Sequence, residues 1–262
     1  MTGILDELYV LHARGKLARI ILAETVLISV ISFFLFGGKD SVTYASAYDF
    51  SIMINDHTSV LSTIIMILLP LFGSFTIGDV FSAEEGIRSY LLARKGKGRY
   101  ISGKICVLLM VSFLNTLFMF ELFTFYESVS IRLTGNLYIP ENFSQIISYC
   151  LENYNPQMLD HPVFFTHLFF MLMSLFASGC GLLSAGIGLY FTNPVFSYIS
   201  GFVAATGVSL INWKYSYFGL FSNFVENLAF SSHLMALSGI LIWFAVMALG
   251  GVILIVLKMR EQ

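Results

Sequence analysis

The sequence predicts an all-α integral membrane protein with six transmembrane helices, and two observations support that fold class. Hydrophobic residues make up 57% of the 262 residues and charged residues only 11%, whereas a soluble domain carries about 25% charged residues. The apolar residues also gather in continuous runs of about 20, the length that an α-helix needs to cross a bilayer. Because these runs do not alternate apolar and polar residues, they predict helices rather than barrel strands.

Six apolar segments are long enough to span a membrane, and we treat residues 18–262 as one domain. The predicted spans are about 18–36, 60–78, 105–126, 163–191, 195–211 and 234–257. The fourth segment is longer than one crossing and is rich in Gly, Ser and Ala. Such small residues either allow close packing between helices, which we favour, or mark a break in the helix.

Basic residues predict which side of the membrane each connection faces. With six spans, both termini lie on the same side. If that side is the cytoplasm, 11 of the 14 Lys and Arg residues lie there, and Lys39, Arg132 and Lys214 lie outside. The positive-inside rule therefore predicts a multi-pass protein of the cell membrane with cytoplasmic N- and C-termini.

Two further segments are predicted to lie at the membrane surface. Residues 1–17 place four apolar residues between Ile4 and Leu11 at helical spacing, which predicts an interfacial amphipathic helix on the inner surface. Residues 212–233 are rich in aromatic side chains. This second segment either dips back toward the membrane as a re-entrant segment or forms an aromatic belt at the outer interface.

The connection between the second and third predicted spans, residues 79–104, carries the most informative pattern. We expect a short helix from Ser82 to Leu92, because Ser82 is a favourable N-cap and Glu85 follows three residues later, as in a capping box. Gly96 and Gly98 are expected to end that helix. The basic residues that follow are Arg94, Lys95, Lys97 and Arg99. Contact with anionic lipid explains the basic cluster alone. An acidic helix with an apolar face of Ile87, Tyr90 and Leu91 instead favours docking of a cytoplasmic partner.

This segment resembles the signature of the permease subunits of type-2 ABC transporters. In that family the second span is followed by an acidic pair and a Gly, then Leu-Leu, a turn, an Arg, an aromatic residue and a Gly-Lys that leads into the third span. The corresponding residues here are Glu84, Glu85 and Gly86, then Leu91 and Leu92, Arg99 and Tyr100, and Gly103 and Lys104. The chain departs from the pattern at Arg88, where a small polar residue or Leu is usual, and in the turn, where a Pro is common.

The resemblance implies a transmembrane permease subunit of an ATP-binding-cassette exporter. Two such subunits, identical or related, would pair in the lipid membrane, and each would dock an ABC ATPase subunit. The residues implied in coupling to that ATPase are Glu84, Glu85, Gly86, Arg88, Leu91, Leu92 and Arg99. The chain contains no G-x-x-x-x-G-K-[ST] sequence, so ATP and Mg are expected on the partner, with no cofactor on this chain. The expected cargo is amphipathic or apolar, such as a peptide antibiotic, toxin or drug.

Three polar residues inside predicted spans are candidates for a translocation path or a dimer seam. Glu24 lies in the first span, and Asn115 and Glu121 lie in the third. An ionisable group at membrane depth is costly, so its presence suggests function, although hydrogen bonding between helices is the simpler explanation. In an alternative hypothesis, the chain is a secondary transporter driven by an ion gradient, and the two glutamates bind a proton or cation.

The sequence also argues against other classes of function. Glu84-Glu85 followed by Arg88 resembles the E-E-x-x-x-R pattern of CAAX-protease-like membrane proteins, but here the spacing is one residue short. His57, His161 and His233 are predicted on the opposite side of the membrane from these glutamates, and His167 lies near that side. No catalytic or metal site is therefore expected. The net charge of −2 gives no indication of a nucleic-acid partner.

Overall fold

The structure, a computed structural model, describes residues 20–27, 60–78, 80–84, 86, 88–134, 162–191, 194–212 and 233–261. All regular structure in these ranges is α-helical, as the sequence predicts. Residues 20–27 form a helical segment. The other helices are α4 (Val60–Ile77), α5 (Val80–Ala83), α6 (Arg88–Lys95), α7 (Lys97–Thr134), α10 (Pro162–Gly188), α11 (Pro194–Asn212) and α13 (His233–Glu261). The predicted helix in residues 1–17 and nearly all of the aromatic segment lie outside the described residues.

Three of the described helices are long and apolar enough to cross a membrane. The qualifying stretches are Lys97–Leu122 of α7, Phe170–Gly188 of α10 and Gly239–Glu261 of α13. Helices α4 and α11 contain shorter apolar stretches, Leu68–Ile77 and Val195–Gly207. These five helices occupy the predicted second to sixth spans, and α10 runs without a break through its Gly-rich part.

The helix expected from Ser82 to Leu92 is wrong in its boundaries. Two shorter helices occupy this region, α5 and α6, and Glu84 and Gly86 lie in turns between them. Ser82 lies inside α5 and therefore does not cap a helix. The turn is stabilised by Tyr100 and Lys104 of α7, which both contact Glu84 and lie outside the local capping pattern.

The third predicted span begins earlier than expected, because α7 starts at Lys97 rather than near residue 105. Gly96 ends α6 as expected, with a φ of 76° that is available to glycine. Gly98, which we expected to break a helix, lies in the first turn of α7. Glycine keeps its backbone N–H and C=O, and its cost in a helix is the entropy lost on ordering, about 1 kcal/mol, which a helix of 38 residues tolerates.

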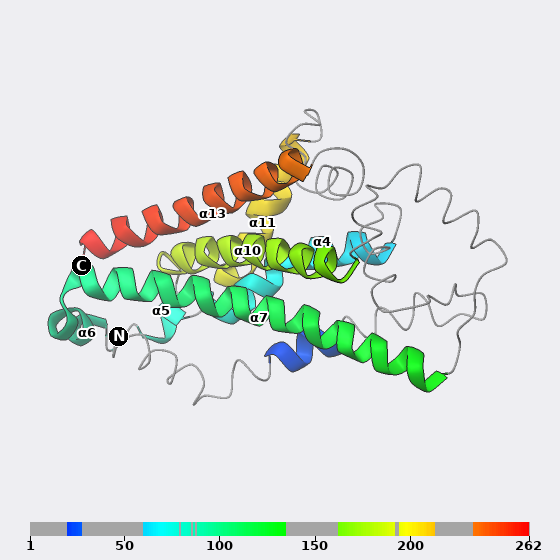
Figure 1. Cartoon of the computed structure of the whole chain (residues 1–262). Helices are drawn as coiled ribbons and strands as arrows, with labels where there is room; N and C mark the ends of the chain where they lie inside the picture. The colour runs from blue at the N-terminus through cyan, green and yellow to red at the C-terminus, as the bar shows by residue number, and fades with distance from the viewer. Residues whose placement is uncertain are drawn as a thin grey trace.

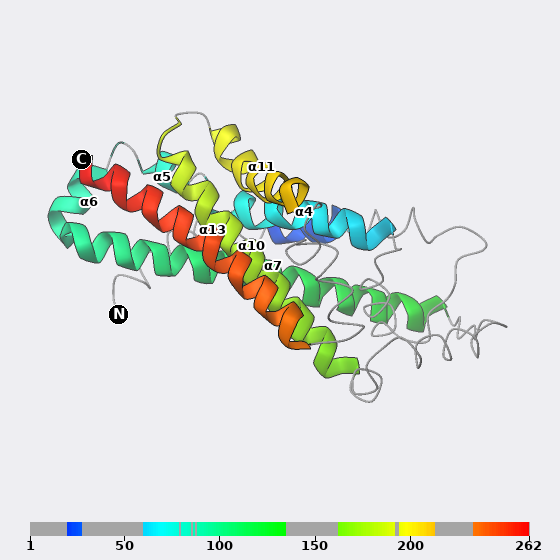
Figure 2. The same cartoon turned by 90° about the horizontal axis from the view of Figure 1, so that it is seen from above.

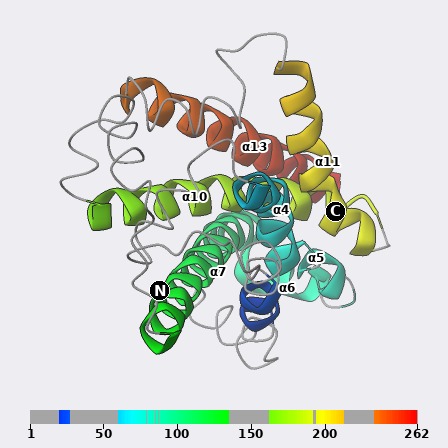
Figure 3. The same ribbon diagram turned by 90° about the vertical axis from the view of Figure 1, so that its right-hand side faces the viewer.

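Helix α10 is the centre of the bundle. It lies between α7 and α13 and also contacts α4 and α11 (Figures 1 and 3). Of the apolar stretch of α10, 78% is buried inside the bundle, whereas the buried share is 44% for the apolar stretch of α7 and 28% for that of α13. The outward side of α13 carries exposed Leu, Ile and Val side chains along its length, as expected for a helix that faces lipid.

Glycines allow α10 to approach its neighbours closely. A Cβ atom added to Gly73 of α4 would lie 2.0 Å from the carbonyl oxygen of Ala177. On another side, a Cβ atom added to Gly251 of α13 would lie 2.6 Å from the backbone of Leu182. No real Cβ atom fits at such distances, so the packing interpretation of the small residues agrees with the structure.

Serine hydroxyls connect α4, α10 and α11 where these helices meet. The hydroxyl oxygens of Ser74 and Ser184 lie 2.7 Å apart, and the backbone N–H of Gly201 donates to Ser184 Oγ at 2.8 Å. Ser197 Oγ donates to the carbonyl oxygens of Gly78 and Ser184. Because buried polar groups are costly without partners, these bonds fix the relative positions of the three helices.

Apart from Arg132 near the C-terminal end of α7, the basic residues of the described ranges lie at one end of the bundle. This basic end contains the start of α7 and the end of α13, which lie near α6 (Figures 1 and 2). An apolar cluster that includes Phe81, Tyr100 and Met259 packs these segments together. That this end faces the cytoplasm stays a prediction from the charge distribution.

We expect Gly73→Ala to lower the free energy of unfolding by about 1–3 kcal/mol, as overpacking of a tight interior does. Gly207→Ala is the matched control, because no described atom beyond its own stretch of helix lies within 4 Å of an added Cβ there, and Ala has the higher helix propensity. Thermal unfolding of both variants in a mild detergent checks the expectation. Equal stabilities of the two variants would contradict the close approach of α4 and α10.

Candidate functional site

The candidate site is the elbow formed by α6 and the start of α7 at the basic end. Gly96 joins the two helices: its N–H donates to Leu92 O at 3.0 Å, and its carbonyl accepts from the N–H of Tyr100 at 3.0 Å. Its positive φ turns the chain between them. The elbow therefore consists of two helices joined by a single residue, a geometry that leaves little freedom for α6 to move independently of α7.

Helix α6 has an inner and an outer face. Leu91 and Leu92 pack against the apolar cluster of the basic end. The outer face, in steps of three and four residues, consists of Ser89, Tyr90, Ala93 and Arg94, all exposed. Tyr90 has 64% of its surface exposed, so its ring is not packed into the bundle. This face is thus available to a partner at the membrane surface.

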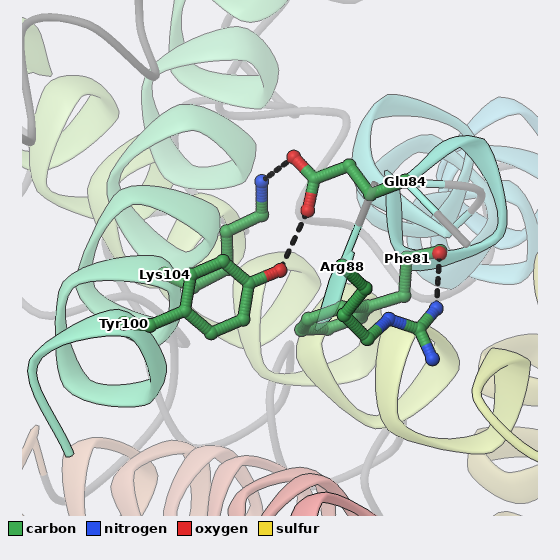
Figure 4. Close-up of polar contacts among 5 residues, drawn as sticks. All are labelled: Phe81, Glu84, Arg88, Tyr100 and Lys104. Carbon is green, nitrogen blue, oxygen red and sulfur yellow. Dashed lines mark hydrogen bonds and ion pairs between the residues drawn. The ribbon is translucent and has the colours of Figure 1, made fainter. Parts of the chain in front are cut away.

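Glu84 fastens the turn before α6 to α7. Its Oε2 accepts a hydrogen bond from the hydroxyl of Tyr100 at 2.7 Å, and its Oε1 pairs with Lys104 Nζ at 2.5 Å (Figure 4). The Lys104 side chain is only 3% exposed and that of Glu84 12%. A buried ion pair is strongly disrupted when one partner is lost, so this contact ties the elbow to the long helix α7.

Arg88 provides a second fastening on the same turn. Its Nη2 donates to the carbonyl oxygen of Phe81 in α5 (Figure 4). The residue is 6% exposed although it is the first residue of α6. Arg88 thus closes the turn between α5 and α6, and its charge lies inside the protein rather than on the outer face.

The structure separates the seven coupling residues implied by the resemblance into two groups. Those that face the interior are Glu84, Arg88, Leu91 and Leu92. Gly86 and Arg99 are exposed. Glu85 lies outside the described residues. The residues that the sequence singled out therefore divide into those that hold the elbow and those that are accessible on it.

Glu24 and Asn115, two of the three intramembrane candidates, are in contact. Asn115 Nδ2 donates to Glu24 Oε2 at 3.0 Å, which joins residues 20–27 to α7. The side chains are buried, with 4% and 3% of their surfaces exposed. This is the interhelical hydrogen bond that we considered the simpler explanation.

Glu121 lies apart from that pair, nearer the far end of α7. Its Oε1 lies 2.8 Å from His167 Nδ1 of α10, and both side chains are between one third and two fifths exposed. An exposed pair of this kind contributes about 0–1 kcal/mol to stability. Glu121 and Glu24 therefore do not form one common site.

Sequence reasoning missed the roles of Tyr100, Lys104 and the serines. Tyr100 and Lys104 were recognised as parts of the family-like pattern, but their contact with Glu84 spans 16 and 20 residues. No local periodicity reports a contact of that separation. The Ser74–Ser184 contact spans 110 residues, and serine in an apolar helix is common, so nothing in the sequence distinguishes it.

Among the described residues, no group of three or more His, Cys, Asp or Glu side chains is arranged to hold a metal ion. Comparisons with protein-family models, curated proteins and solved structures gave no match to this chain. The function must therefore be argued from the geometry and the sequence pattern.

We expect Lys104→Met to destabilise the elbow, because it leaves Glu84 buried without its cation, at a cost of about 3–5 kcal/mol. Limited trypsin digestion should then cleave faster after Arg94 and Arg99, and the unfolding temperature should fall. The matched control is Lys258→Met, since the Lys258–Glu261 pair is exposed. The double variant Glu84→Gln with Lys104→Met should recover part of the lost stability. Unchanged cleavage in Lys104→Met would show that the ion pair does not hold the elbow.

Proposed function

We propose that this chain is the transmembrane permease subunit of an ATP-binding-cassette exporter. In this proposal the chain has six spans, its basic end faces the cytoplasm, and the elbow of α6 and α7 receives a separate ATPase subunit. Two permease subunits, the same or related, pair in the membrane. The exported cargo is amphipathic or apolar.

The observation that carries the proposal is the outer face of α6. A short helix with exposed Tyr90 and Arg94 is held firmly to the bundle by the Glu84–Lys104 pair. Exposed Tyr and Arg side chains are those that most often dominate protein interfaces. A helix that merely connected two spans would need neither a buried ion pair nor an exposed aromatic residue.

The attachment of the elbow to α7 supports transmission of movement. Glu84 bonds to the first two turns of α7, a helix of 38 residues that reaches the far end of the bundle (Figure 1). A force on α6 is therefore applied directly to α7. Because α7 packs on α10, the movement reaches the centre of the bundle, as a coupling helix requires.

The distribution of charge supports the proposed orientation. The exposed cations Arg94, Lys97 and Arg99 lie on the elbow, and Lys258 and Arg260 lie at the end of α13. Cytoplasmic connections carry such an excess of Lys and Arg. The three exposed cations of the elbow favour an acidic surface on the docked subunit, because complementary charge steers association.

We expect Tyr90→Ala and Arg94→Glu each to reduce recovery of an ATPase subunit when the tagged chain is purified in mild detergent. A central interface residue contributes about 2 kcal/mol or more, which corresponds to roughly 30-fold in affinity. Quantitative mass spectrometry of the co-purified proteins measures the loss, and nucleotide-stimulated export should fall with it.

Lys258→Glu is the control for the charge change, because this exposed residue belongs to α13 and not to the elbow. It should leave recovery of the ATPase unchanged. Failure to recover any P-loop ATPase with the unaltered chain in several mild detergents would overturn the exporter proposal.

One observation favours the gradient-driven carrier as the second candidate. Glu24 and Asn115 place a carboxyl group and an amide together inside the bundle, and such groups mark ion pathways in carriers. Transport by reconstituted protein that follows a pH or ion gradient, without any ATPase, would favour this candidate. Transport that requires ATP and ignores both gradients would remove it.

A further inference from the structure

The Glu24–Asn115 pair has an incomplete set of hydrogen bonds. One bond joins Asn115 Nδ2 to Glu24 Oε2 at 3.0 Å. The remaining oxygen of each group, Glu24 Oε1 and Asn115 Oδ1, is buried and has no hydrogen-bond partner among the described residues. Buried polar atoms without partners are rare and costly, so the pair lacks a component.

The missing component is a hydrogen-bond donor. An ionised carboxylate is an acceptor only, and the oxygen of an amide is likewise an acceptor. Two acceptors that belong to groups already joined by one hydrogen bond cannot satisfy each other. A single proton on Glu24 Oε1 turns this oxygen into a donor. The carbonyl oxygen of Asn115, Oδ1, is the acceptor that its partner offers. The two groups can then be joined by two reciprocal hydrogen bonds.

The surroundings of the pair offer little to stabilise a negative charge. Helix α4 carries no titratable side chain, and the titratable residues of α10 are His167 and Cys180. On α7, Lys104 is three turns before Asn115, roughly 16 Å along the axis, and is paired with Glu84. Glu121 lies roughly 9 Å beyond Asn115 and is bonded to His167.

The residues around the pair do not complete the coordination shell of a metal cation. Hard cations take about six or more oxygen ligands, and this pair offers two. A proton needs only the two oxygens that are present.

We infer that Glu24 and Asn115 form a proton-binding site inside the helical bundle. A proton from water forms an O–H bond at Glu24 Oε1, and the charge of the pair changes from minus one to zero. The site joins residues 20–27 to α7, so gain or loss of the proton changes the contact between the first and third predicted spans. This inference is independent of the ATPase docking proposed above.

Infrared spectroscopy of the full chain in lipid vesicles at neutral pH tests the site. We expect the C=O band of a protonated carboxylic acid, identified by its shift in D2O. The band should be lost completely in Glu24→Gln, which keeps the shape of the neutral acid. It should remain in the matched control Glu121→Gln. In Asn115→Leu it should move to higher frequency, because the acid loses its hydrogen-bond partner.

Three results would overturn the inference. The first is absence of the band in the unaltered chain at neutral pH, and the second is its persistence in Glu24→Gln. The third is loss of the band on addition of sodium chloride but not of choline chloride, which would assign the site to a metal cation. A band that does not move in Asn115→Leu would overturn the role of Asn115.

Discussion

Direct backbone contact between α10 and its neighbours is the constraint on which the rest of this structure depends. Gly73 and Gly251 are the positions at which α4 and α13 meet α10 from two sides. In a membrane the hydrophobic effect does not drive helices together, so dispersion contacts and interhelical hydrogen bonds must do so. The serine contacts of α4, α10 and α11 become possible only at this short separation. A larger side chain at Gly73 would separate α4 from α10 and break the Ser74–Ser184 contact, and one at Gly251 would push α13 away from α10.

The same tight bundle gives the basic end its rigidity. Tyr100 belongs to the apolar cluster of that end and also donates a hydrogen bond to Glu84. One residue therefore contributes both apolar packing and a polar contact. Lys104 is buried four residues further along α7 and completes the attachment. The elbow is therefore an extension of the bundle rather than a flexible connection. Residues that in the sequence resemble a recognition motif contribute in part to this attachment, while the outer face of α6 remains accessible.

Periodic and compositional signals predicted most of the fold, whereas the contacts of single side chains could not be predicted. Helices α4, α10, α11 and α13 lie close to their predicted spans, because an apolar run fixes the position of a helix by itself. The helix expected at Ser82 failed because Glu84 has partners on α7 that local capping rules do not consider. Tyr90 was counted with the apolar face, yet it is exposed. Asn115 was recognised as a polar residue in a span, but only the fold shows that it meets Glu24, which lies 91 residues away.

The central claim is that the outer face of α6 is the docking surface for an ATP-hydrolysing subunit. Photo-crosslinking in the native membrane tests it most directly, with p-benzoylphenylalanine in place of Tyr90 and, as a control, in place of the exposed Ile253 of α13. The account predicts a protein adduct from position 90 that contains a P-loop ATPase, whereas position 253 should not give that adduct. Adducts from position 90 that contain only lipid would contradict the docking surface and would leave the elbow as a membrane-surface element.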